Sequence, residues 1–252
     1  MSTVHAIRSQ VLEYARGHDF TKPTFSTMND ELSDAIELAN SGKAPSPFGK
    51  IEIVIPGRPV SVQSAKPVKD EYLARIKKVL SNYQYVLTGQ LILDVTWLLP
   101  AKSRYETDAS VDIDNCLKPI IDAFTGPDGL FVNDCQIKGL YICWRHIESG
   151  DERLHFEFEF DADQFCCKEG LAFIRLNKGL CCPVNRTWPM AVRVAWVGAI
   201  KMGELFKSQL EKLGAPYLAL SGMVGGNQPF HITRTAGFPL ITADEFIAGV
   251  DA

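Results

Sequence analysis

Two aspartates, Asp112 and Asp114, stand two residues apart at the start of an apolar run, VDIDNCLKPIIDAFTG, that ends at Gly126. Residues i and i+2 of an extended segment face the same way, so both carboxylates can converge on one hard cation. The alternative is helix capping, for which Asp114 is well placed. Capping uses one acid and leaves the other without a role.

A third carboxylate, Asp134, stands just before the strand-like segment CQIKGLYICW, after a turn that can bring it back beside the first two. Three converging carboxylates cannot all stay ionised in a small space without a cation. Mg²⁺ takes oxygen ligands and keeps waters for phosphate chemistry. The spacing therefore predicts a magnesium site formed by Asp112, Asp114 and Asp134.

Lys118 follows Asp114 by four positions, one helical turn, which places an ammonium group near the same site. There it could stabilise the charge that develops on a scissile phosphate. The alternative is an ion pair with Asp114 or Asp122, worth only about 0.2–0.5 kcal/mol. The string D-x-D-N is common, and it lacks the glycine and spaced oxygen ligands of an EF-hand loop.

The elements that must position these residues are expected in the order β-α-β-α-β-β within residues 49–162. Alternating or continuous apolar segments predict the strands, and helical spacing of apolar residues predicts the helices. The strands are expected at 50–56, 90–100, 135–147 and 153–161, and the helices at 69–84 and 111–126. The predicted fold class is α/β (α+β), a small mixed sheet with flanking helices.

The flanking segments differ in texture from this domain. Residues 1–48 predict a helical extension, with helices at 4–17 and 29–42 and Asn29 as a cap. Residues 163–252 predict a second, smaller α/β unit of unassigned role. Its expected elements are a strand at 190–200, a helix at 202–214, a strand at 216–222 and a helix at 241–249 with a Thr242/Glu245 capping box.

The composition indicates a folded, soluble, cytoplasmic protein, with 46% hydrophobic residues in 252 and no apolar run long enough to span a bilayer. The net charge of −4 argues against a strongly basic nucleic-acid binder, but it hides an uneven distribution. Residues 50–105 carry nine Lys/Arg and four Asp/Glu, whereas residues 106–162 carry four and thirteen. The acidic half could hold a metal cation, and the basic half beside it could bind phosphates. Ordinary solvent-exposed faces of helices and strands would explain the same charge distribution.

The seven cysteines fit reduced thiols of the cytosol better than a disulfide framework. Cys116, Cys135 and Cys143 are expected to be small core residues. The doublets Cys166-Cys167 and Cys181-Cys182 could supply four zinc thiolates, but adjacent cysteines lack the gap that presents two sulfurs to one ion. Buried or incidental thiols are the favoured interpretation.

The segments DIDNCLKPIIDAFTG and LFVNDCQIKGL together resemble the signature of RusA-type Holliday-junction resolvases. That signature reads D-x-D-N, then lysine, then D-A-L/F, then an acidic pair followed by one residue and Q-I/V. PGRPVSVQSAKP also resembles the first strand and following loop of the family, so the similarity covers about residues 50–161. It implies a small α/β domain of the same element order that acts as a homodimer and cleaves branched DNA with Mg²⁺.

Carried over by position, the resemblance implies that the catalytic carboxylates are Asp112, Asp114 and Asp134 and that Lys118 is the essential lysine. Mg²⁺ would be the cofactor, with Mn²⁺ as a substitute. Three further positions match the motif in supporting roles: Asn115, Asp122, which would orient Lys118, and Gln136, which would support the Asp134 turn.

Two departures from the family pattern stand out. Asn133 replaces the first of two consecutive acids, although the second acid, Asp134, is the one that matters in the pattern. Family members often carry a basic run before D-x-D, whereas KSRYETDASV offsets its two cations with acids, which predicts weaker phosphate contacts. The cations that could form a DNA surface are Lys66, Lys69, Lys77, Lys78, Lys102 and Arg104, and a solvated helix face is the alternative for the first four.

The sequence thus favours a magnesium-dependent, structure-selective DNA endonuclease whose partners are branched DNA and a second copy of the chain. One alternative is a nuclease for foreign or replicating DNA under control of the added segments, and another is a DNA-structure binder or assembly subunit that does not cleave. The C-terminal unit could dock a protein partner. Its segment SGMVGGNQPFHITRTAG matches neither nucleotide-loop pattern, although His231 and Arg234 could contact a ligand.

Overall fold

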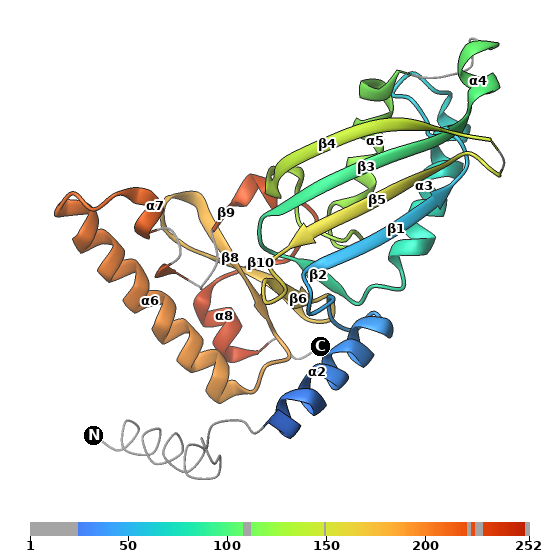
Figure 1. The fold of residues 1–252 in the computed structure, drawn as a ribbon. Coiled ribbons are helices and arrows are strands. Elements are labelled where there is room, and N and C mark those ends of the chain that lie inside the picture. The colour runs from blue at the N-terminus through green and yellow to red at the C-terminus, as the bar shows by residue number, and fades with distance from the viewer. Residues whose placement is uncertain (1–24, 108–111, 149, 221–222, 225–228, 250–252) are drawn as a thin grey trace, which may run out of the picture.

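The computed structural model describes residues 25–107, 112–148, 150–220, 223–224 and 229–249, without the side chains of residues 25–30, Asp114 and Leu218. It has the mixed α+β architecture that the sequence predicts, with several sheets and flanking helices (Figure 1). The helix expected at 4–17 lies outside the described residues. The next helix, α2 (Phe25–Asn40), begins four residues before Asn29, so the predicted cap at Asn29 is wrong. Neither glycine nor proline interrupts Phe25–Met28, and the helix therefore extends through it.

The first sheet has the strand order β1-β5-β3-β4. β5 is antiparallel to both β1 and β3, whereas β3 and β4 are parallel. The strands are β1 (Lys50–Pro56), β3 (Leu91–Pro100), β4 (Ile137–Ile147) and β5 (Arg153–Phe160). Alternate residues of β3 are buried, as expected for a sheet with one face covered.

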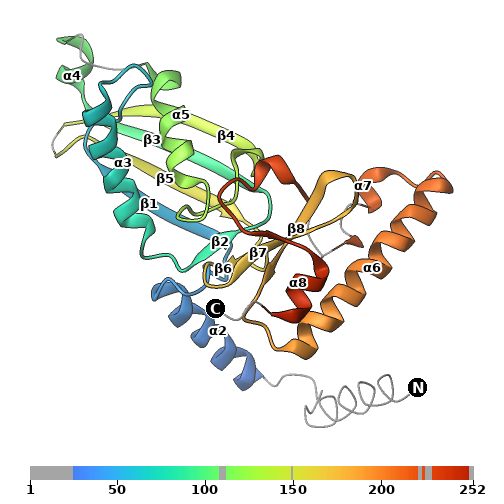
Figure 2. The ribbon, with the colours of Figure 1, turned by 180° about the vertical axis from the view of Figure 1, so that it is seen from behind.

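Two helices, α3 (Lys66–Leu80) and α5 (Ile113–Phe124), cover that buried face (Figure 2). The short elements β2 (Tyr85–Leu87) and α4 (Ala101–Tyr105) are added to the predicted order. The Phe124 ring lies 5.0 Å from Phe156 and 5.3 Å from Phe158 between centroids. Burial of each such ring contributes about 1.5–3 kcal/mol. This packing fixes the helix that carries Lys118.

A tight loop returns the chain from α5 toward β4. The N–H groups of Leu130 and Phe131 donate to the Phe124 carbonyl oxygen, and both side chains are fully buried. A Cβ atom at Gly129 would lie 2.3 Å from that oxygen, so the loop requires glycine there. The loop ends at the 3-10 turn η1 (Asp134–Gln136), which precedes β4.

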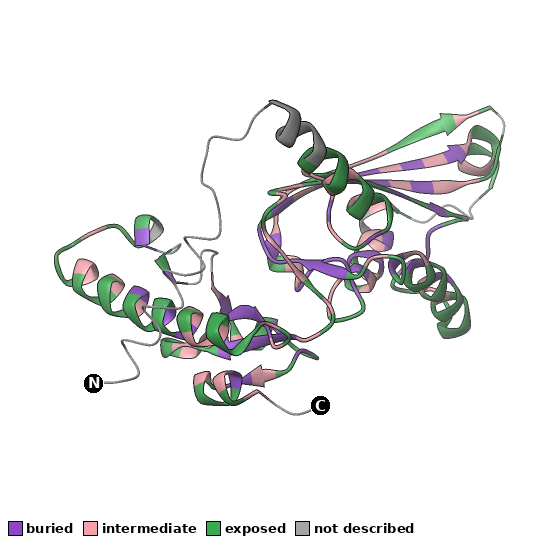
Figure 3. Ribbon diagram, turned by 90° about the horizontal axis from the view of Figure 1, so that it is seen from below, coloured by how far each residue is buried: buried purple, intermediate pink, exposed green. Residues whose placement is uncertain are grey.

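The second unit packs helices against a sheet of order β10-β7-β8-β9. Figure 3 shows its buried residues gathered on the strands and on the facing side of the long helix. The strands are β7 (Leu171–Arg175), β8 (Leu180–Asn185), β9 (Phe230–His231) and β10 (Leu240–Ile241), and the helices are α6 (Met190–Lys212), α7 (Tyr217–Leu220) and α8 (Ala243–Ala248).

Two predictions for this unit are wrong. The segment expected as a strand at 190–200 forms the first part of α6, and the described residues of the strand expected at 216–222 include all of α7. The buried positions of α6 are Val197, Ile200 and Gly203, three residues apart, so its β-branched run packs with helical spacing. The capping box of Thr242 and Glu245 at α8 is confirmed.

The two units share an apolar cluster. Val86 and Val132 from the first unit pack with Phe173, Phe230 and Phe238 from the second. β2 also pairs with β6 (Phe165–Cys167), which follows β5 directly. The second unit therefore packs against the loop that leads to η1.

The four cysteines of the two doublets are all described, and they are not grouped to hold a zinc ion. Cys181 and Cys182 are neighbours on β8 and face opposite sides, since Cys182 belongs to the cluster under α6 and Cys181 to the one shared by the two units. Burial raises the pKa of the Cys182 thiol to about 12. Cys116 is buried as predicted, but Cys135 is exposed in the η1 turn, and Cys143 is only half-buried because β4 is an edge strand. Among the described residues, no helix is long and apolar enough to cross a membrane.

Candidate active site

The N-terminus of α5 carries the first acids of the site. Asp112, not Asp114, occupies the N-cap position, and its carbonyl oxygen accepts from the N–H of Asn115 at 3.1 Å. Within the described residues, the exposed Asp112 carboxylate makes no capping hydrogen bond. The predicted cap at Asp114 is therefore wrong, because the helix begins one residue earlier, at Ile113. The Asp114 side chain lies outside the described residues.

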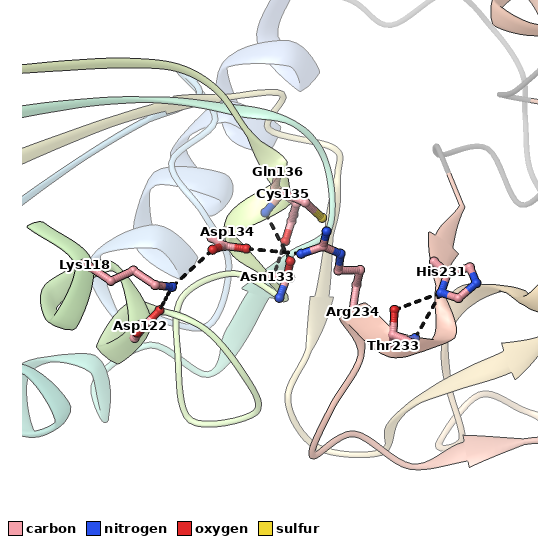
Figure 4. Close-up of polar contacts among 9 residues, drawn as sticks. All are labelled: Lys118, Asp122, Asn133, Asp134, Cys135, Gln136, His231, Thr233 and Arg234. Carbon is pink, nitrogen blue, oxygen red and sulfur yellow. Dashed lines mark hydrogen bonds and ion pairs between the residues drawn. The ribbon is translucent and has the colours of Figure 1, made fainter.

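Lys118 lies between two carboxylates (Figure 4). Its Nζ donates to Asp122 Oδ1 at 2.5 Å and to Asp134 Oδ2 at 3.4 Å. The hydrogen bond to Asp122 raises the pKa of Lys118 above its ordinary value, so the side chain is an ammonium ion at neutral pH. Such a group can stabilise negative charge but cannot act as a general base.

Asp134 is held in place by a reciprocal cap. The Asn133 side chain accepts from the Cys135 N–H at 3.2 Å, and the Gln136 side chain accepts from the Asn133 N–H at 3.0 Å. The Gln136 amide nitrogen donates to the carbonyl oxygens of Leu87 at 3.0 Å and Gly89 at 2.7 Å. The turn that presents Asp134 is thus fastened to the backbone between β2 and β3.

These residues, together with most of the first sheet, lie in a segment of the chain that matches a known protein family. Residues 61–157 match the family model for endodeoxyribonuclease RusA. The RusA-like segment, defined as these residues, contains every predicted site residue from Asp112 to Gln136 and confirms the resemblance. No curated protein matches the chain.

Arg234, outside the RusA-like segment, reaches the same site. Its Nη1 lies 3.8 Å from Asp134 Oδ1, on the side of the carboxylate opposite Lys118 (Figure 4). It ends the 3-10 turn η4 (Ile232–Arg234). The sequence marked Arg234 as a ligand contact but gave no sign of this location, because no pattern links positions 100 residues apart. His231 instead caps its own turn, where its Nδ1 lies 2.9 Å from Thr233 Oγ1.

The cations considered for a DNA surface are spread over the RusA-like segment. Lys66 pairs with Asp70 at 2.5 Å, and Lys69 donates to the Val62 carbonyl oxygen at 3.0 Å. Lys77 and Lys78 are exposed in the last turn of α3.

Lys102 and Arg104 lie on α4, far from Asp134. α4 directly follows the end of β3, which is paired with the end of β4, whereas Asp134 precedes the start of β4. The strand length places them about 30 Å apart. The Arg104 guanidinium lies over the Trp144 ring, 5.4 Å from its centroid. These two cations therefore cannot contact the same phosphate as Lys118.

The donor set suits a hard divalent cation. Asp112 and Asp134 offer carboxylate oxygens, the ligands that Mg²⁺ prefers, and the Asp112 carboxylate is not engaged as a helix cap. Among the described side chains, no group of three or more His, Cys, Asp or Glu is arranged to hold a metal ion. The two described acids fit the cation in chemistry, and the site of three carboxylates that includes Asp114 stays a prediction.

Proposed function

We propose that this protein is a divalent-metal-dependent endodeoxyribonuclease that cuts Holliday junctions or other branched DNA. The observation that carries the proposal is the 3.4 Å approach of Lys118 Nζ to Asp134 Oδ2 within the RusA-like segment. Sixteen residues separate the two in sequence, and the loop and the η1 turn bring them together.

Each residue has a distinct role in the proposed reaction. Asp112, Asp114 and Asp134 would hold Mg²⁺, for which Mn²⁺ could substitute, and the bound cation would activate a water and neutralise charge on the phosphodiester. Lys118 contributes a fixed positive charge to the phosphate oxygens as negative charge develops.

Three residues support this arrangement. Asp122 orients the Lys118 ammonium through their 2.5 Å contact. Gln136 holds the Asp134 turn against the backbone. The Asn115 carbonyl oxygen accepts from the Val62 N–H at 3.0 Å and ties the start of α5 to the loop before α3.

Selectivity for branched DNA would come from shape. A homodimer, as the resemblance implies, presents two sites to two strands of a junction. The cations spread over the RusA-like segment suit contacts to phosphates, which position a protein on DNA without reading its sequence. The second candidate, a nuclease for other DNA controlled by the added segments, is favoured by the contact that Arg234 of the C-terminal unit makes with Asp134.

A cleavage assay tests the proposal directly. The protein is incubated with a synthetic four-way junction and with a linear duplex of the same sequence, first with Mg²⁺ and then with EDTA. We expect symmetric nicks in the junction that require Mg²⁺. Equal cutting of the linear duplex would favour the second candidate, whereas tight binding without cutting of either DNA would contradict both and indicate a non-cleaving binder.

A further inference from the structure

Arg234 brings a cation to the proposed nuclease site from outside the RusA-like segment. Its Nη1 lies 3.8 Å from Asp134 Oδ1, and its side chain is 54% exposed. The separation exceeds a hydrogen-bond distance, so the contact is electrostatic and does not lock the guanidinium donors onto the carboxylate. An arginine held in this way keeps the N–H donors of its planar guanidinium group available to another anion.

Core packing fixes where this arginine stands. Phe230 and Phe238, which flank it in sequence, pack with Val132, two residues before Asp134. Thr235, next to Arg234, is 4% exposed, and its Oγ1 donates to the Ile232 carbonyl oxygen at 3.0 Å. Both sides of the Arg234–Asp134 contact are therefore anchored in one apolar cluster.

Gly237, on the same segment as Arg234, marks a second place where this segment lies close to the loop between α5 and η1. Gly237 has a φ of +87°, and a Cβ atom there would lie 3.3 Å from the Pro127 ring, which belongs to the loop between α5 and η1. The segment that carries Arg234 thus lies directly against the loop that carries Asp134. An accidental encounter of two surface side chains would not bring the two segments this close.

We propose that Arg234 is a phosphate-binding residue of the nuclease site, supplied by the C-terminal unit. Without a bound cation it neutralises Asp134. A divalent cation at Asp134 repels the guanidinium, which then turns to a phosphate of the DNA, an anion that its bidentate geometry suits. This inference rests on the proposed function, because it takes Asp134 as a cation ligand and DNA as the substrate.

The competing explanation is a surface ion pair without function, since exposed pairs contribute little to stability. The two explanations differ in DNA and cation binding. A phosphate-binding arginine that also covers Asp134 affects the two affinities in opposite directions. Loss of an arginine without function would change Mn²⁺ affinity through its charge alone and would leave junction binding like that of the control.

The test compares Arg234→Gln, Arg234→Lys and the matched control Arg175→Gln, which removes an exposed arginine at the end of β7. Mn²⁺ is titrated alone into each protein, and binding of a synthetic four-way junction is measured in Ca²⁺ and in EDTA over a range of salt. Gels of the same samples show whether the strands stay intact.

Arg234→Gln is expected to bind Mn²⁺ about threefold more tightly, because a repelling charge is lost. In Ca²⁺ it should bind the junction about tenfold more weakly, with the salt slope reduced by about one. The loss should be smaller in EDTA, where Asp134 retains the arginine. Arg234→Lys keeps the positive charge but lacks the planar guanidinium group. It should therefore return Mn²⁺ affinity to the wild-type value and recover only part of the junction affinity.

If Arg234→Gln binds the junction in Ca²⁺ as tightly as Arg175→Gln does, this inference alone is overturned, provided that the wild type binds Mn²⁺ and the junction. A wild type that binds neither overturns the proposed function and the inference with it. The two failures are thus distinguished by the wild-type measurements.

Discussion

At the residue scale, the Gln136 amide lies beneath the site and contacts three backbone groups, those of Leu87, Gly89 and Asn133. The side chain is only 4% exposed, so these hydrogen bonds are shielded from water. Asp134 stands at the start of the turn that this amide fastens. The orientation of the carboxylate toward Lys118 therefore depends on a residue that does not touch it.

Replacing Gln136 with methionine should lower the free energy of unfolding by about 1–3 kcal/mol, because it removes the hydrogen bonds that this buried amide makes to the backbone. Junction cutting should fall as well, since the Asp134 turn loosens. Denaturant unfolding and the cleavage assay measure the two effects. Gln209→Met, on the exposed side of α6, is the matched control and should change stability by less than about 0.5 kcal/mol. Equal stability of the two variants would contradict this role.

Much of this site follows from local spacing. Residues four apart on a helix are neighbours, so the proximity of Lys118 to Asp122 can be predicted from the sequence. The turn after Gly126 gave reason to expect Asp134 nearby. Arg234 could not be placed in this way, because its position depends on the packing of Phe230 and Phe238 against Val132.

At the element scale, the first sheet and its two helices were predictable because each has one buried face, and apolar residues mark it. β3 alternates strictly between buried and less buried positions, and β5 does so from Arg153 to Glu159. α6 was mistaken in part for a strand, because VRVAWV alternates over a short window. Only the complete helix shows that Val197, Ile200 and Gly203 form its buried side.

Two glycines of α6 allow a paired test of this helix. A Cβ atom at Gly203 would lie 2.4 Å from the Met223 carbonyl oxygen, whereas at Gly198 it would meet nothing within 4 Å. Gly203→Ala should therefore destabilise the protein by about 1–3 kcal/mol. Gly198→Ala should stabilise it by about 0.5–1 kcal/mol, since alanine favours helices. Thermal unfolding measures both changes, and the same sign for the two would show that Gly203 is not in close contact.

At the scale of the whole molecule, the RusA-like segment and the C-terminal unit share one apolar cluster and the β2–β6 pairing. Val86 and Val132 are almost fully buried, and part of their cover comes from residues after 162. The sequence predicted two α/β units but not this contact, since each unit contributes only a few of its residues. The cluster leads us to expect cooperative unfolding of the complete chain.

Phe238→Ala should lower the free energy of unfolding by about 3–5 kcal/mol, because it opens a cavity in the shared cluster. Calorimetry should show one transition that moves as a whole to lower temperature. Phe206→Ala is the control, since Phe206 is 57% exposed on α6. Two separate transitions, of which Phe238→Ala moves one, would mean that the units unfold independently.

The central claim is that Asp134 belongs to a metal-dependent cleavage site, and cutting of a four-way junction by Asp134→Asn tests it most directly. The substitution removes the charge that would hold the cation and leaves a side chain of equal size. We expect Mg²⁺-dependent cutting to fall at least about a hundredfold, while junction binding in EDTA stays equal or becomes tighter. Asp163→Asn, an exposed acid with the same change of charge, should cut like the wild type. Undiminished cutting by Asp134→Asn would contradict the account.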